Sequence, residues 1–168
     1  RYKDLPKKEI DDRSRKIGLG ALKFFILKND PSKDITYDPK ESVSFDGETG
    51  PYVQYAYARI NSIFEKGGIN KVSIKADYST YDDKEKQLIK KLADYPKVVI
   101  DAMKNFKPSY VARYLLELSQ MFNEYYHSHQ VLKEKEDIKN ARLLLLDSIR
   151  IVIKNGLEIL GIDAVERM

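Results

Sequence analysis

Cysteine is absent from this chain of 168 residues, and histidine is scarce, with 2 residues. Without cysteine the protein can form neither a disulfide bond nor a zinc site with thiolate ligands, which fits a reducing compartment. His127 and His129 lie two positions apart, so on a helix they do not share a face and cannot bind one metal ion together. We therefore expect no metal site, with His129 in the core and His127 exposed.

Long apolar runs are absent as well. No stretch approaches the roughly 20 apolar residues that a membrane-spanning helix requires. The N-terminal segment RYKDLPKKEIDDRSRK is too charged to be a secretory signal. We therefore expect a cytoplasmic protein with no membrane partner. The chain starts at Arg1, without an initiator methionine, in a polar segment followed at once by a helical pattern, and from this we expect a fragment of a longer protein.

Neither sign of charge dominates the composition. The chain carries 30 basic and 26 acidic residues, for a formal net charge of +4 and a pI near 9.0. This is a mild bias and not a nucleic-acid signature. Tyrosine is abundant instead, with 12 residues and no tryptophan, which is about twice the typical usage. A tyrosine ring joins a flat apolar face to a hydrogen-bonding hydroxyl, so it suits binding surfaces as well as cores.

Residues 108–132 carry the longest uninterrupted helical pattern, and we expect the rest of the fold to pack around it. Apolar side chains recur at alternating steps of four and three, so they form one stripe along a helix. Tyr126 and His127 fall off this stripe and are available to a partner. The stripe consists of Val111, Leu115, Leu118, Phe122, Tyr125, His129 and Leu132.

A second informative helix is predicted between Thr49, as its N-cap, and the pair Gly67-Gly68 at its end. Its core stripe is Val53, Ala56, Tyr57, Ile60, Ile63 and Phe64.

Tyr52, Tyr55, Arg59 and Ser62 fall on a separate face of this helix, at steps of three, four and three. Two rings and a guanidinium in a row can form a platform on which unpaired bases stack, with the arginine also reaching a phosphate. The alternative is that the rings pack on neighbouring helices and Arg59 meets a carboxylate. The pattern alone leaves both interpretations open.

The remaining periodic segments complete an all-α helical bundle, with one short β-hairpin near the N-terminus. Helices are predicted over residues 8–27, 85–93, 96–105 and 138–160, the last closed by Gly161. The hairpin would pair a strand around Ile35 and Tyr37 with one around Val43 and Phe45. Gly18 and Gly20 interrupt the first helix, and we interpret them as sites of close helix packing and not as a phosphate loop.

Four blocks of sequence together resemble the C-terminal part of an arginyl-tRNA synthetase, a class I aminoacyl-tRNA synthetase. They are IGLGALKF, SFDGETGPYVQYAYARINSIF, ARYLLELSQMFNEYYHSHQVL and the terminal GLEILGIDAVERM. The resemblance covers nearly the whole chain, in the same order. It implies that residues 1–47 are the tail of the catalytic domain and that residues 48–168 are a helical anticodon-binding domain of the DALR type.

For chemistry, the resemblance implies that the catalytic residues lie elsewhere. The two class I signatures, which bind ATP, precede the region that this chain resembles, and neither occurs in it. Carboxylates are plentiful, but no spacing singles out a general acid and base. We therefore expect no catalytic residue and no cofactor in this chain, with ATP and magnesium serving the parent enzyme, which attaches arginine to its tRNA.

The resemblance also implies which residues contact RNA. They are Tyr52, Tyr55, Arg59, Tyr126 and Met168. The expected partner is tRNA, not DNA, and the parent enzyme is expected to be a monomer. The alternative from another class is a helical module that binds protein through the same tyrosines.

Two positions depart from the family's pattern. Gln130 stands where the family often has a basic residue, which predicts the loss of one phosphate contact. Val165 stands where it often has proline, which predicts a looser C-terminal tail.

Overall fold

The protein is described by a computed structural model that covers residues 5–74 and 78–168. Within these residues the chain forms six α-helices, one 3-10 helix and no strand, which confirms the all-α prediction. The elements are α1 (Lys7–Leu27), α2 (Pro39–Ser42), α3 (Gly50–Gly67), η1 (Tyr78–Thr80), α4 (Asp83–Asn105), α5 (Ser109–Ser128) and α6 (Glu136–Ile159).

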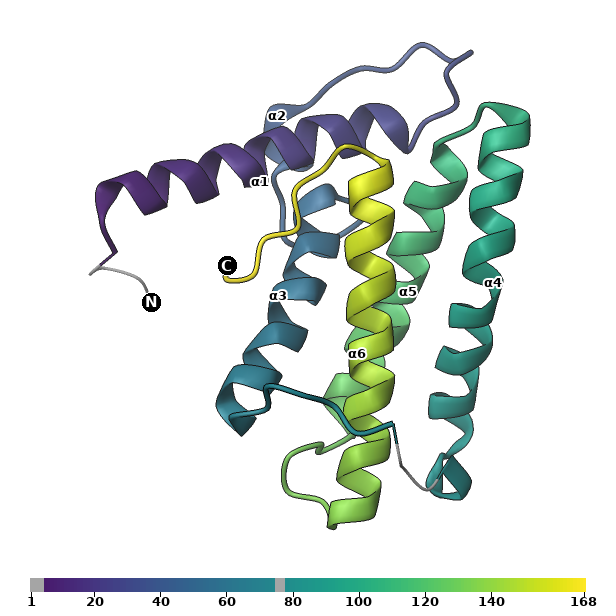
Figure 1. The fold of residues 1–168 in the computed structure, drawn as a ribbon. Coiled ribbons are helices and arrows are strands. Elements are labelled where there is room, and N and C mark those ends of the chain that lie inside the picture. Colours follow the sequence, from purple (N-terminus) through teal and green to yellow (C-terminus); the bar gives the residue numbers. More distant parts are fainter. Residues whose placement is uncertain (1–4, 75–77) are drawn as a thin grey trace.

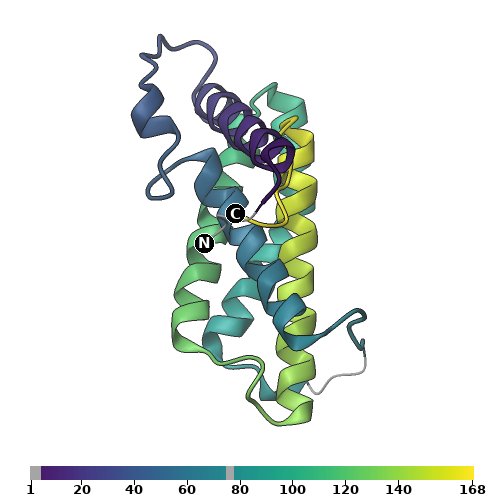
Figure 2. The same ribbon diagram turned by 90° about the vertical axis from the view of Figure 1, so that its left-hand side faces the viewer.

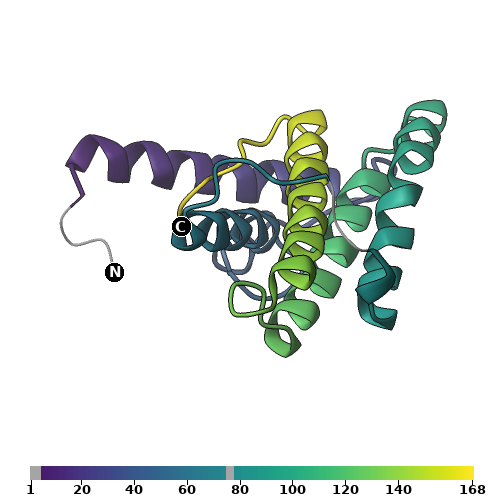
Figure 3. The ribbon, with the colours of Figure 1, turned by 60° about the horizontal axis from the view of Figure 1, so that its bottom comes forward.

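Helices α3, α4, α5 and α6 run side by side as a bundle, and α1 crosses one end of it (Figure 1). In Figure 2 the segment that carries α2 lies on the far side of α1 from α6. The chain leaves the end of α6 beside α1 and returns toward α3, so that the C-terminus lies next to α3 in Figures 1 and 3. Helix α1 therefore covers one end of the bundle, and the C-terminal segment lies along its side, next to α3.

The predicted central helix is confirmed as α5, but it ends earlier than expected. Val111, Leu115, Leu118, Phe122 and Tyr125 are each at most 1% exposed, as their spacing predicts. The helix stops at Ser128 and not at residue 132, and His129 is already extended. The residues after it are therefore free to form a loop across the end of α3.

Helix α3 begins and ends where its capping residues predict. The Thr49 hydroxyl accepts a hydrogen bond from the Tyr52 amide at 3.2 Å, and Gly68 ends the helix in the left-handed region, with φ of 61°. All six residues of its predicted core stripe are buried. Helix α6 ends at Ile159, and Gly161, which the sequence predicts to close it, follows in the left-handed region with φ of 67°.

The prediction of two helices on either side of Pro96 is wrong, because α4 is continuous from Asp83 to Asn105. Proline removes one helical hydrogen bond, which costs about 3 kcal/mol in an isolated helix. Here the apolar face formed by Leu88, Leu92, Tyr95, Val98 and Ala102 runs through the proline and packs on the core. Tertiary burial therefore overrides the local penalty.

The predicted β-hairpin over residues 35–45 does not form. The turn expected at residues 38–40 instead starts the short helix α2. The Asp38 carboxylate accepts hydrogen bonds from the Lys40 amide at 2.8 Å and the Glu41 amide at 3.2 Å. An N-cap aspartate followed by proline favours a helical turn over two paired strands.

Helices α1 and α3 meet at two glycines. A Cβ added to Gly50 would lie 2.6 Å from the Gly20 carbonyl oxygen and 2.8 Å from the Phe24 Cβ. The close-packing interpretation is therefore confirmed for Gly20. It is wrong for Gly18, where an added Cβ would meet nothing within 4 Å.

The C-terminal tail is held by both α1 and α3. Gln54, which is fully buried, donates a hydrogen bond from Nε2 to the Asp163 carbonyl at 2.8 Å. Lys23 donates to the Gly161 carbonyl, and Arg167 Nε donates to Glu65 at 3.0 Å. Val165 is 5% exposed, so the valine is packed, in contrast to the loose tail expected from it.

Because Gly50 faces backbone atoms that cannot move aside, Gly50→Ala is expected to lower the free energy of unfolding by about 1–3 kcal/mol. Gly18→Ala is the matched control, since it lies inside α1 in open space and should stabilise the helix by roughly 0.5–1 kcal/mol. Urea unfolding of both variants measures the two effects. Equal stabilities would show that the two helices do not approach as closely as described.

Candidate functional site

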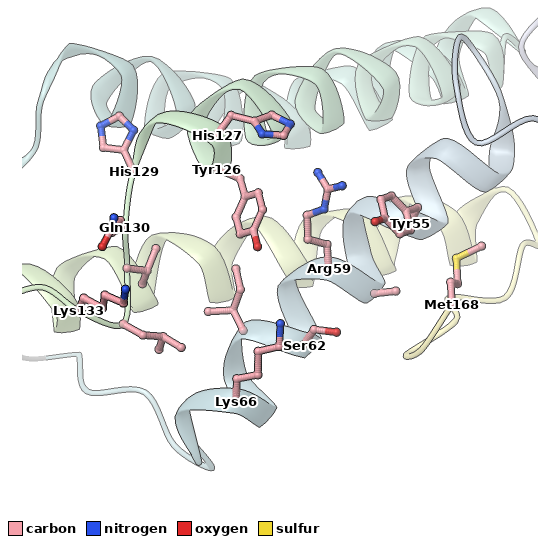
Figure 4. A pocket seen from close by; sticks show the side chains of 14 residues that line it. Tyr55, Arg59, Ser62, Lys66, Tyr126, His127, His129, Gln130, Lys133 and Met168 are labelled. Carbon is pink, nitrogen blue, oxygen red and sulfur yellow. The ribbon is translucent and has the colours of Figure 1, made fainter. Parts of the chain in front are cut away.

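A hollow lies between α3, the C-terminal end of α5 and the loop that follows α5. It has a volume of about 460 Å³. Figure 4 shows Tyr55, Arg59, Ser62 and Lys66 along α3, with Tyr126 and His127 on α5 facing them. Met168 closes one end of the pocket and Lys133 the other. A pocket of this size suits one compact ligand group, such as a nucleotide.

The helix α3 supplies one side of the pocket through a single face. Tyr55, Arg59, Ser62 and Lys66 follow one another at steps of four, three and four, so they point the same way. The opposite face of α3 is buried against α5 and α6. The core packing of the helix therefore decides which residues face the pocket.

The loop wall exists because α5 ends at Ser128. The Ser128 hydroxyl folds back onto the Glu124 and Tyr125 carbonyls, at 3.1 and 3.2 Å. His129 stacks on the Tyr125 ring with centroids 4.3 Å apart, and its Nε2 lies 2.6 Å from an Asp82 carboxylate oxygen. These contacts draw His129 away from a helical path, and residues 129–133 then line the pocket.

The buried carboxylate of Glu85 holds the loop of residues 129–133 in place through Arg142. Glu85 is 1% exposed and accepts hydrogen bonds from the Tyr125 hydroxyl at 3.0 Å and from Arg142 Nε at 2.8 Å. Arg142 Nη1 donates in turn to the Gln130 carbonyl at 2.8 Å and to Glu134 at 2.9 Å. One network therefore ties α4, α5 and α6 to the loop that forms the pocket wall.

The network also shifts two pKa values. Burial raises the pKa of the Tyr125 hydroxyl above its usual range, and the Glu85 carboxylate adds to this effect, so the hydroxyl stays protonated as a donor. Burial alone would raise the pKa of Asp82. Hydrogen bonds from the Glu85 amide and the His129 ring outweigh burial and lower that pKa, so Asp82 is charged at neutral pH.

Four of the five predicted contact residues line the pocket together, namely Tyr55, Arg59, Tyr126 and Met168. Tyr52 does not line it, and its hydroxyl accepts a hydrogen bond from Asn123 Nδ2 at 2.9 Å. The Arg59 guanidinium lies 4.5 Å from the centre of the Tyr55 ring and 5.1 Å from that of Tyr126. The pocket therefore presents two rings with a cation between them (Figure 4).

The pocket is more positive than the chain as a whole. Arg59, Lys66 and Lys133 line it, and none of the described residues in its wall is aspartate or glutamate. Acidic residues make up 26 of the 168 residues of the chain, so their absence from a wall of 14 residues favours an anionic ligand.

Sequence reasoning missed the two lysines of this wall. Lys66 continues the spacing of Tyr55, Arg59 and Ser62 by one more turn, so the pattern could have revealed it. Helical spacing could not reveal Lys133. It lines the pocket only because α5 stops at Ser128 and the chain then continues as a loop. Gln130 and Lys133 line the same wall, so Lys133 supplies a cation three positions after the glutamine.

The groups that line the pocket suit the binding of a flat or anionic ligand. Aromatic faces, cations and amide or hydroxyl groups are present, and the described residues contain no group of three or more histidine, aspartate or glutamate side chains placed to hold a metal ion.

Across the described part of the chain, no helix has both the length and the apolar character needed to span a bilayer.

Comparison with protein families and known proteins gives one consistent match. Residues 53–168 match the family model of the DALR anticodon binding domain. The chain is 48% identical to an arginine–tRNA ligase of Clostridium beijerinckii over 160 residues, or 94% of this chain. It is 38% identical to one of Parabacteroides distasonis over an alignment of 169 positions that covers 98% of this chain. It spans 28% of the length of each of these relatives.

Solved structures match over the same extent. A Thermus thermophilus arginyl-tRNA synthetase superposes with a TM-score of 0.90 and 36% identity, covering 99% of this chain and 29% of that one. A Plasmodium falciparum arginyl-tRNA synthetase gives a TM-score of 0.81 and 26% identity, covering 95% of this chain and 28% of that one.

Replacing Arg142 with methionine leaves the buried Glu85 carboxylate without its cationic partner, so the free energy of unfolding should fall by about 3 kcal/mol. Arg113→Met is the matched control, since Arg113 is exposed on α5 and its loss should change stability by no more than about 0.5 kcal/mol. Denaturant unfolding of the two variants compares them directly. Equal stability of both would contradict the role given to the Glu85–Arg142 pair.

Proposed function

This chain belongs to the DALR anticodon binding domain family, and from this premise we propose that it recognises the anticodon of tRNA as part of an arginine–tRNA ligase. The relatives are named arginine–tRNA ligases, and the proposal assigns this chain to such an enzyme, although it spans 28% of their length. Residues 48–168 would be the anticodon-binding domain, and residues 1–47 the tail of the catalytic domain. ATP and magnesium would serve the catalytic part, in a cytoplasmic and monomeric enzyme.

The charge and shape of the pocket carry this proposal. Two tyrosine rings and three basic side chains line a hollow of about 460 Å³, and no acidic residue of the described wall opposes them. Flat rings attract nucleobases, and cations attract phosphates. A pocket that combines both over one helix face suits a short unpaired stretch of RNA.

Each predicted contact residue has a distinct part in this binding. A base splayed out of the anticodon loop loses its stacking neighbours, and Tyr55 or Tyr126 can replace them with a flat ring face. Arg59 lies between these rings and can pair with a phosphate or stack under a base. Met168 offers an apolar contact at the end of the pocket. Tyr52 acts from behind the pocket wall, through Asn123.

The size of the pocket and its two ring faces favour unpaired nucleotides over duplex DNA. A pocket for single unpaired bases suits the loop of a folded RNA, whereas duplex DNA keeps its bases stacked and paired. The +4 net charge adds only weak attraction for duplex phosphates. The partner that fits is therefore an exposed RNA loop, as in the anticodon arm of a tRNA.

Replacing Tyr126 with alanine should weaken tRNA binding by about 1–3 kcal/mol, because one stacked base loses its ring partner. Tyr55→Ala should behave in the same way. Leucine at either position should restore little, since it fills space without a ring face. Tyr110→Ala is the matched control, because Tyr110 is 41% exposed on the same helix α5 and lies outside the pocket.

Melting curves of the same tyrosine variants separate binding from folding. Normal melting with weak tRNA binding supports the assignment. If Tyr55 and Tyr126 serve only as packing residues, the alanine variants should instead lose about 3–5 kcal/mol of stability while each folded molecule still binds tRNA normally.

Binding should also depend on salt through a small number of phosphate contacts. The slope of log K against log salt is about −0.7 to −0.9 for each phosphate neutralised. Lys66→Gln and Lys133→Gln should each reduce its magnitude by roughly that amount, and the exposed Lys90→Gln on α4 should leave it unchanged. A salt-independent affinity, equal in all three variants, would instead favour a protein-binding module.

A further inference from the structure

The Arg59 side chain, which lies between the two tyrosine rings, is hydrogen-bonded to a residue of α5. Its Nη1 donates a hydrogen bond to Asn123 Oδ1 at 2.7 Å. Arginine side chains are long and lose considerable rotamer freedom when they are ordered. Among the described residues, this is the one side-chain acceptor that the guanidinium uses, so Asn123 determines where the cation lies.

The orientation of the Asn123 amide is fixed by its two partners. A guanidinium only donates, so the amide oxygen must face Arg59 and the amide nitrogen must point away from it. That nitrogen donates to the Tyr52 hydroxyl at 2.9 Å. Flipping the amide would place two donors against each other. Tyr52, Asn123 and Arg59 therefore form one chain of hydrogen bonds with a single arrangement.

Asn123 also shares a face of α5 with Tyr126, one of the two rings of the pocket. It lies three residues before Tyr126 on α5, so the residue that holds the guanidinium and the ring beside it move as one unit. Tyr52 precedes Tyr55 by three residues on α3 in the same way. The hydrogen-bond chain therefore fixes the separation of the two rings as well as the cation between them.

We propose that Asn123 is a positioning residue for RNA recognition, which holds the Arg59 guanidinium between Tyr55 and Tyr126 through its hydrogen bonds to Arg59 and Tyr52. This inference rests on the proposed function for its consequence in binding. Its structural part stands on the geometry alone. A guanidinium held in place loses less freedom when a base or phosphate arrives, so binding is tighter than with a mobile arginine.

A spectroscopic signature tests the positioning without RNA. Protons near the faces of aromatic rings resonate upfield, so the Arg59 Nε–H proton should be displaced from the usual arginine range, and the Arg59→Lys variant identifies it by its disappearance. In Asn123→Ala the signal should move toward that usual range. In Asn105→Ala, a control at the exposed end of α4, it should not move. An unchanged signal in Asn123→Ala would overturn the proposal.

Binding of a tRNA anticodon stem-loop, measured with melting temperatures, completes the test. Asn123→Ala should bind about tenfold more weakly with near-normal melting. Asn123→Asp still accepts from Arg59 and should keep the displaced signal, but its charge neutralises the guanidinium and should reduce the salt slope by roughly 0.7. If Arg59→Ala loses affinity and Asn123→Ala does not, the positioning role is wrong and the proposed function stands. If the unaltered protein does not bind the stem-loop, the proposed function is wrong, and the arginine signal still decides whether Asn123 holds Arg59.

Discussion

The burial of one apolar stripe of α5 is the constraint on which the rest of the structure depends. Leu115, Leu118 and Phe122 are fully buried between the other helices, and this fixes the rotation of α5 about its axis. With that rotation set, Tyr125 points inward to Glu85, and Tyr126, one residue later, faces the pocket. The core and the pocket are therefore consequences of the same packing.

The sequence predicts those parts of the site that repeat with the period of a helix. Tyr55, Arg59 and Tyr126 are each found by their spacing relative to a core stripe, because periodicity separates buried from exposed faces. The resemblance to a known family adds Met168, which no spacing indicates. Helices α1, α3, α5 and α6 are predicted for the same reason, with ends set correctly where a capping residue such as Thr49 or Gly161 is present.

The remainder depends on contacts between residues far apart in the chain. The end of α5 is set by His129 meeting Asp82, which lies 47 positions away, and this contact brings Lys133 into the pocket. Asn123 has no unusual spacing, and its importance follows only from its bonds to Arg59 and Tyr52, on another helix. The continuity of α4 through Pro96 likewise comes from tertiary packing, which outweighs a local rule.

We expect RNA to bind in the pocket between α3, α5 and the C-terminal tail, and the three methionines of the chain provide a direct test. Met168 lines the pocket, Met121 packs against the core, and Met103 is 68% exposed on α4. With methyl-labelled methionine, adding a tRNA anticodon stem-loop should shift the Met168 signal and leave those of Met103 and Met121 in place. Binding that shifts Met103 and leaves Met168 unchanged would contradict the account.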